Sequence, residues 1–170
     1  MVAQDKHLFS KMKLDEVRMN SSLYTDGLFS HVDLGFRLAP KQRFSIGGGG
    51  SIYRGQNRLI HDEENGYAFF LTASVEHYWT STEEFKGLYT GLGTGFWDLS
   101  ITWEEGDRKG TTDIQTFQPS IYMGYRFPLS EKWISGVQAG YSHLIELREV
   151  GQNINLNGGL LVGLTLARKL

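Results

Sequence analysis

The fold is decided by the stretch 133–148, WISGVQAGYSHLIELR, in which side chains of two kinds alternate. One face is mainly apolar and presents Trp133, Val137, Ala139, Tyr141, Ile145 and Leu147. The other face is small or polar and presents Gly136, Gln138, Gly140, Ser142, Glu146 and Arg148. A period of two is that of an extended strand, whose successive side chains point to opposite sides. The stretch therefore predicts a β-strand with two different faces, longer than the usual strand of about 5–6 residues.

The same alternation recurs along the chain, which shows no long amphipathic helical pattern. It predicts eight strands, at 9–20, 28–39, 43–54, 67–80, 87–103, 113–127, 133–148 and 155–169. The first strand is rich in charged residues and is expected to begin late or to be irregular. We expect one domain over residues 1–170, with 1–10 as an irregular N-terminal segment.

The connections between these strands alternate in length. Short polar turns are predicted at 39–42, 81–86 and 128–132, and longer connections at 21–27, 55–66, 104–112 and 149–154. Such alternation indicates an up-and-down meander, with the long connections on one rim and the short turns and both termini on the other.

The apolar faces form a band that must either fill a soluble barrel or meet lipid. The opposite face carries small and compact polar residues, which suit a narrow lumen better than a water-exposed surface. A strand that crosses a bilayer needs about 9–11 residues, which these strands provide. We therefore predict an all-β, closed, antiparallel, up-and-down transmembrane β-barrel of about eight strands. Its lipid-facing side would include Leu71, Leu160, Val162 and Leu164. A soluble lipocalin-like barrel that binds an apolar ligand stays open as an alternative.

Aromatic residues gather near both ends of the predicted strands, as in the two girdles of a transmembrane barrel. The predicted girdle beside the short turns comprises Trp79, Phe127 and Trp133. The predicted girdle beside the long connections comprises Trp97, Trp103, Phe117 and Tyr141.

The predicted lumen contains ionisable groups, which must pair or reach water in a narrow interior. We predict a polar network of His31, Asp33, Arg37, Glu76, Asp98, Arg126, Gln138, Glu146 and Arg148. Candidate pairs join Glu76 or Glu146 to Arg37, Arg126 or Arg148. An eight-stranded barrel leaves room for little besides such side chains.

Composition excludes several classes of protein and site. The chain of 170 residues has no cysteine, which excludes a disulfide scaffold, a thiolate zinc site and a cysteine nucleophile. A net charge of −2 gives no sign of nucleic-acid binding. The histidines show no metal-ligand spacing, so we expect neither a metal nor a cofactor. The longest apolar runs, 67–71 and 160–162, are far too short for a membrane-spanning helix.

Hydrolysis requires a nucleophile, a base and an orienting acid within hydrogen-bond reach. Ser142 and His143 are adjacent, so in a strand they face opposite sides and cannot form a dyad. The sequence therefore predicts no catalytic residues, and the charged lumen residues are explained more simply by pairing. A membrane-embedded lipid A-type acyl hydrolase remains the alternative.

Three features together resemble the small outer-membrane β-barrel family, the eight-stranded kind typified by the OmpX and OmpA barrel domains. They are the alternation in 67–79 and 133–147, the unequal connections, and the last strand, 158–170, which ends on a hydrophobic residue. The resemblance implies a monomer in the lipid bilayer of a bacterial outer membrane. It also implies a structural role, or recognition of a surface ligand or envelope protein through the long loops.

Two local features carry further expectations. Val2-Ala3-Gln4 fits both the end of a cleaved leader and an ordinary start, and we expect a signal peptide to have been removed. Pro119 falls inside a strand that barrel closure makes central, where proline lacks a ladder hydrogen bond. We expect a bulge or a later strand start there.

Overall fold

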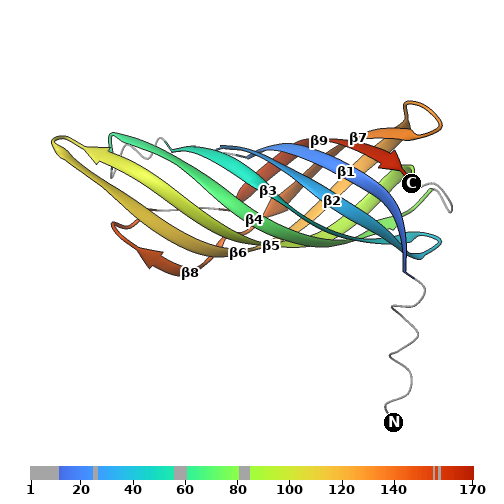
Figure 1. Ribbon diagram of the computed structural model, residues 1–170, viewed down its shortest axis with the longest axis horizontal. Helices are drawn as coiled ribbons and strands as arrows, with labels where there is room; N and C mark the ends of the chain where they lie inside the picture. The colour runs from blue at the N-terminus through green and yellow to red at the C-terminus, as the bar shows by residue number, and fades with distance from the viewer. Residues whose placement is uncertain (1–11, 25–26, 56–60, 81–84, 155, 157) are drawn as a thin grey trace, which may run out of the picture.

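The computed structural model describes residues 12–24, 27–55, 61–80, 85–154, 156 and 158–170 (Figure 1). Its strands are β1 (Lys13–Tyr24), β2 (Gly27–Ala39), β3 (Gln42–Gly55), β4 (Glu63–Tyr78), β5 (Gly87–Glu105), β6 (Arg108–Pro128), β7 (Trp133–Ser142), β8 (Ile145–Val150) and β9 (Gly159–Lys169). No helix in these ranges is long and apolar enough to cross a bilayer. The expected irregular segment 1–10, and residues 56–60 and 81–84 of two predicted connections, lie outside the described residues.

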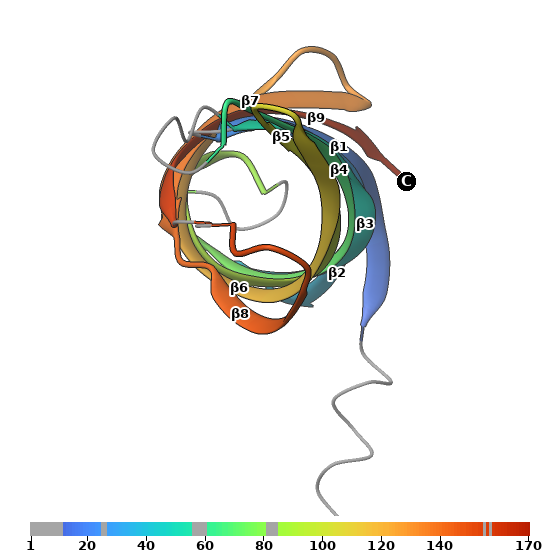
Figure 2. The same cartoon turned by 90° about the vertical axis from the view of Figure 1, so that its left-hand side faces the viewer.

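The strands close into a ring (Figure 2). β1 to β7 pair in chain order, β9 follows β7, and β1 pairs with β9 to close the barrel, with every pair antiparallel. β8 also pairs with β6, beyond the end of β7, so β7 and β8 are two parts of the predicted strand 133–148. The predicted all-β, antiparallel, eight-stranded barrel is therefore confirmed.

The break between β7 and β8 explains how Pro119 fits into a central strand. His143 donates its backbone N–H to the carbonyl oxygen of Pro119 at 3.0 Å, next to the point where β7 ends at Ser142. In an antiparallel ladder the N–H and C=O of one residue point to the same neighbour. The missing N–H of Pro119 therefore faces the break, where the partner strand leaves the ladder. The expected irregularity lies in the partner strand, and β6 continues through Pro119.

Two predicted long connections are mostly strand. Within 104–112, β5 and β6 continue to a two-residue turn at Gly106 and Asp107, with Gly106 at φ +57°. Within 21–27, β1 runs to Tyr24 and β2 starts at Gly27. Backbone pairing continues where the apolar alternation stops, because water-exposed strands need no apolar face. The β5–β6 hairpin consequently projects from the barrel end opposite the beginning of β1 and the end of β9 (Figure 1).

The outer wall of the barrel is apolar. Leu160, Leu71 and Val162 have 74%, 70% and 62% of their surface exposed, whereas Glu76 is fully buried inside. A soluble barrel would show the reverse arrangement, because the hydrophobic effect buries apolar side chains. The lipocalin-like alternative is therefore wrong.

Candidate functional site

Six charged side chains fill the half of the lumen nearest the beginning of β1 and the end of β9. They are the charged network, and they come from five strands: Glu16 and Arg18 of β1, Asp33 of β2, Arg43 of β3, Glu76 of β4 and Arg126 of β6. None has more than 3% of its surface exposed. Three arginines balance three carboxylates, so the network is neutral as a whole and its burial is feasible.

The charges alternate along one continuous path. It runs from Asp33 to Arg18, Glu76, Arg43, Glu16 and Arg126, and each step is an ion pair. Arg18 Nη1 donates to Glu76 Oε1 at 2.6 Å, and Arg126 Nη2 donates to Glu16 Oε2 at 2.8 Å. Each of the two glutamates thus binds two arginines, which satisfies the lone pairs of these buried carboxylates.

Neutral side chains complete the network. The hydroxyl of Tyr78 donates to Glu76 at 2.8 Å and accepts from Arg126 at 2.9 Å, and Tyr122 donates to Glu76 at 3.2 Å. Asn20 donates to Asp33 at 2.5 Å. The carboxylates therefore have hydrogen bonds in addition to their ion pairs.

Phe85 closes the lumen at the short-turn end. It is 1% exposed, its ring centroid lies 5.0 Å from that of Tyr78, and the guanidinium of Arg37 lies 4.8 Å from it. Its φ of +44° is unusual for a residue other than glycine. The surrounding cations and ring hold the strained residue in place.

The other half of the lumen is filled by an aromatic cluster. Its buried members are Tyr53, Ala68, Phe70, Trp97, Leu99, Ile101, Trp103, Ile114 and Ile154. Phe70 stacks on Trp97 with ring centroids 4.0 Å apart. At its edge, buried Glu64 accepts hydrogen bonds from Tyr53 at 2.9 Å and contacts His61 at 2.6 Å. Ile154 comes from the connection after β8, so that connection helps to fill the barrel.

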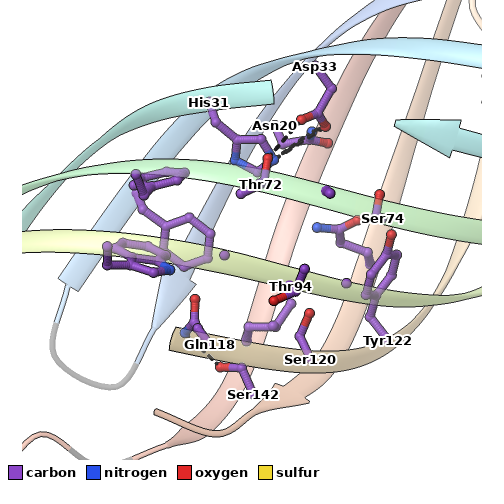
Figure 3. A pocket seen from close by; sticks show the side chains of 18 of the residues that line it. Asn20, His31, Asp33, Thr72, Ser74, Thr94, Gln118, Ser120, Tyr122 and Ser142 are labelled. Atoms are coloured by element: carbon purple, nitrogen blue, oxygen red, sulfur yellow. Dashed lines mark hydrogen bonds and ion pairs between the residues drawn. The ribbon is translucent and has the colours of Figure 1, made fainter. Parts of the chain in front are cut away.

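A cavity of about 80 Å³ lies between the charged network and the aromatic cluster (Figure 3). This is room for a few water molecules. His31 borders it and contacts Asp33 at 3.4 Å and Asn20 at 3.1 Å. Ser142 also borders it, and its hydroxyl accepts from Gln118 at 3.0 Å. Within the described part of the chain, no hydroxyl hydrogen-bonds to His31, so those residues assemble no nucleophile–base pair there.

Most, but not all, of the predicted network lies inside the barrel. His31, Asp33, Glu76, Arg126 and Gln138 point inward, and Gln138 accepts from Tyr89 at 3.1 Å. Arg37 lies at the rim, where it pairs with Asp15 at 3.4 Å. The partners of Glu76 are Arg18 and Arg43, and none of the arginines proposed for it.

The prediction is wrong for Asp98, Glu146 and Arg148, which are exposed. Glu146 lies opposite buried Thr116, so it keeps the predicted side but is exposed there. A β-bulge in β8 after Glu146 shifts the register, so that Arg148 lies opposite exposed Gln115. A shift of one residue moves a side chain to the other face. Arg148 therefore joins the outer wall.

Asp98 and two predicted girdle residues were assigned to the wrong faces of β5. Trp97 and Trp103 are 9% and 7% exposed and belong to the aromatic cluster, so their girdle assignment is wrong. The apolar face of this part of β5 points into the lumen because it packs in the aromatic cluster, and the outward face carries Asp98, Ser100 and Thr102. Of the other predicted girdle residues, Trp79, Phe127, Trp133 and Tyr141 are exposed, and Phe117 packs beside Phe96 on the outer wall at 5.1 Å.

Three members of the charged network were not predicted: Glu16, Arg18 and Arg43. The signal was present in β1, where buried Glu16, Arg18, Asn20 and Ser22 alternate with outward Val17, Met19 and Leu23. Its charge made the segment look irregular, although the same charge is what the lumen requires. The described residues contain no group of three or more histidines and carboxylates placed to hold a metal ion.

Comparison with known proteins shows the fold alone. No family model and no curated protein matches the sequence. The N-terminal β-barrel domain of Pseudomonas aeruginosa OprF matches over 92% of this chain and 96% of its own, with 15% identity and a TM-score of 0.55. Acinetobacter baumannii CarO matches over 93% and 98%, with 10% identity and a TM-score of 0.56. Neisserial surface protein A matches over 92% and 94%, with 9% identity and a TM-score of 0.54. The expected likeness to small outer-membrane barrels is thus confirmed at the level of fold.

Proposed function

We propose that this chain, which has the fold of small outer-membrane β-barrels, is a monomeric barrel that spans a bacterial outer membrane and carries a recognition surface outside it. The observation that carries the proposal is the inverted polarity of the barrel. Exposed leucine, valine and phenylalanine side chains cover the wall, and six charges are buried inside it. A bilayer stabilises such an apolar wall, and closure of the barrel satisfies the backbone hydrogen bonds within it.

The filled lumen argues against transport as the main activity. The charged network and Phe85 occupy one half, and the aromatic cluster occupies the other. The cavity between them holds only a few waters. A structural or recognition role is therefore the better proposal.

The recognition surface would be the part of the sheet that lies beyond the end of β7. It is made of β8 and the neighbouring parts of β6 and β5. In the described part of the chain, β8 has β6 as its one strand neighbour, so its other edge has unpaired backbone groups. Ile145, Leu147 and Val150 are also exposed on it. An open edge of this kind binds an extended segment by strand addition. The partner would be a surface ligand or envelope protein that supplies such a segment.

Trypsin added to intact cells tests the orientation. We expect cleavage after Arg108 and Lys109, whose side chains are 73% and 65% exposed at the tip of the β5–β6 hairpin. Lys132 lies in the turn at the opposite end and should be protected until the cells are lysed. The fragments are identified by mass spectrometry. Cleavage at Lys132 in intact cells, with Arg108 and Lys109 protected, would reverse the orientation.

We also propose that the barrel is not an enzyme. Lipid A from cells with and without the protein should carry the same number of acyl chains, because the described residues bring no hydroxyl nucleophile to His31. Mass spectrometry of lipid A measures this. Loss of an acyl chain that depends on the protein, and that disappears in His31→Ala or Ser142→Ala at unchanged stability, would establish the hydrolase instead.

A further inference from the structure

The rim at the short-turn end of the barrel has an excess of exposed positive charge. Among its described residues, Lys13, Lys86, Lys132 and Arg168 have exposed basic side chains, and Glu131 is the one exposed acid. The turn before β7 and the end of β9 lie side by side at this rim (Figure 1). Their contact brings Lys132 close to Arg168, so part of the charge is concentrated at one point.

Arg168 ends an apolar row on the outer wall. The outward side chains along β9 are Leu160, Val162, Leu164, Leu166 and then Arg168. Val162 lies near the middle of the barrel wall, and six residues of a strand tilted by about 45° rise by about 14 Å along the bilayer normal. Half of the hydrocarbon core is about 15 Å thick. In a barrel placed as proposed above, Arg168 therefore reaches the level of the lipid phosphates.

Trp133 and Lys132 lie beside Arg168. Trp133 is 42% exposed and lies directly opposite Arg168 in the β7–β9 ladder. Lys132 immediately precedes Trp133, and its carbonyl oxygen accepts the backbone N–H of Lys169 at 2.9 Å. One step between neighbouring strands changes the depth by only about 3 Å at this tilt, so the indole and both cations lie near one interface. Lys132, Trp133 and Arg168 are called the basic rim site.

The two cations of the basic rim site have no counterion among the described residues. Lys132 and Arg168 are exposed, and neither side chain forms a hydrogen bond or ion pair with another described residue. The residues opposite Arg168 in its two ladders are Val17 and Trp133, which are uncharged. Two cations at the edge of an apolar wall are therefore available to an anion that comes from outside the chain.

We propose that the basic rim site binds the headgroup of an anionic phospholipid of the phosphatidylglycerol type in the periplasmic leaflet. That leaflet of a bacterial outer membrane consists of glycerophospholipids, so such a ligand is present on the side where the site lies. Arg168 binds the phosphate through charge-assisted hydrogen bonds, and Lys132 adds a second cation. Trp133 lies at the interface, and Leu166 contacts the upper part of an acyl chain. This inference rests on the proposed membrane placement and adds a ligand to it.

Net charge selects among the common phospholipids. Phosphatidylglycerol carries one negative charge and no cation. Phosphatidylethanolamine and phosphatidylcholine each carry an additional cation, which Arg168 and Lys132 repel. A basic residue near an anionic lipid surface strengthens binding by about fivefold. The basic rim site should therefore prefer phosphatidylglycerol to both zwitterionic lipids.

Native mass spectrometry of the full chain measures the preference. The protein is refolded into vesicles with equal amounts of phosphatidylglycerol, phosphatidylethanolamine and phosphatidylcholine of matched acyl chains, extracted in mild detergent, and the retained lipids are counted. Both leaflets of these vesicles have the same composition, so the result does not depend on orientation. We expect about fivefold enrichment of phosphatidylglycerol over either other lipid. Arg168→Gln should remove most of it, and Lys132→Gln should lower it.

Lys41→Gln is the matched control and should keep the preference. Lys41 lies at the same rim, between β2 and β3, where its Nζ donates to the carbonyl oxygen of Trp79 at 3.4 Å. Equal loss in Lys41→Gln and Arg168→Gln would show that the whole rim attracts the lipid and would overturn the site. Equal retention of the three lipids, or an unchanged preference in Arg168→Gln, would overturn the proposal as well.

The trypsin test separates this inference from the proposed function. A protein that inserts into vesicles and is cleaved as expected in cells, but shows no lipid preference, overturns this inference alone. Cleavage at Lys132 in intact cells overturns the assignment to the periplasmic leaflet, whatever the lipid preference.

Discussion

The variant Glu76→Gln should lower the free energy of unfolding by about 3–5 kcal/mol, the effect of removing one partner from a buried ion pair. Glu76 is fully buried and accepts hydrogen bonds from Arg18, Arg43, Tyr78 and Tyr122. Glutamine keeps the shape of the side chain but not its charge, so two buried arginines lose a shared counterion. Urea titration of the refolded protein in vesicles, followed by tryptophan fluorescence, measures the change.

Glu104→Gln is the matched control for this result. Glu104 pairs with Lys109 at 2.6 Å, but both side chains are largely exposed on the β5–β6 hairpin. An exposed pair contributes about 0–1 kcal/mol, so the control should stay close to the parent protein. A loss below about 1 kcal/mol in Glu76→Gln would mean that water enters the lumen and screens the charged network.

The variant Val162→Arg should lower the free energy of unfolding in vesicles by about 2–4 kcal/mol, the cost of an arginine on the lipid face near the bilayer midplane. Val162 is 62% exposed on the outer wall and lies opposite Ala139, near the middle of β7. Val162 points away from the lumen, so the substitution disturbs no packing inside the barrel. Its cost comes from placing a charged arginine in lipid. The same urea titration in vesicles measures it.

Leu170→Arg separates this effect from a general cost of adding a cation. Leu170 is exposed at the rim where the chain ends, and an arginine near the interface costs about 0–1 kcal/mol. Equal stability of Val162→Arg and the parent protein would contradict a lipid-facing Val162. A parent protein that is a monodisperse monomer without detergent would contradict the whole proposal of membrane insertion.

The sequence by itself determined which residues face outward wherever the two faces of a strand differ. In β4, β7 and β9 most residues of one face are apolar, and Leu71, Val137 and Leu164 of that face are exposed as predicted. The ring order also follows from the sequence, because a meander with short connections pairs each strand with the next one along the chain. Glu76 and Ser142 were placed inside the barrel by the same rule, and both are buried.

Only the tertiary structure decided the faces of β5 and the direction of Arg148. A local period of two identifies a strand, but it does not say which face points outward, and from Trp97 to Trp103 the apolar face of β5 points into the lumen. The bulge in β8 depends on its pairing with β6, next to the break that Pro119 requires. One inserted residue reverses every later side chain, and nothing in the alternation of 145–150 marks it.

Ion pairing was likewise decided by closure of the barrel. Arg18 meets Glu76 across 58 positions of sequence, and Arg126 meets Glu16 across 110. The alternation shows that these side chains point inward, because that is a property of each strand alone. Which of them meet depends on the height of each strand in the closed ring, which is set by the register of all the strand pairs together.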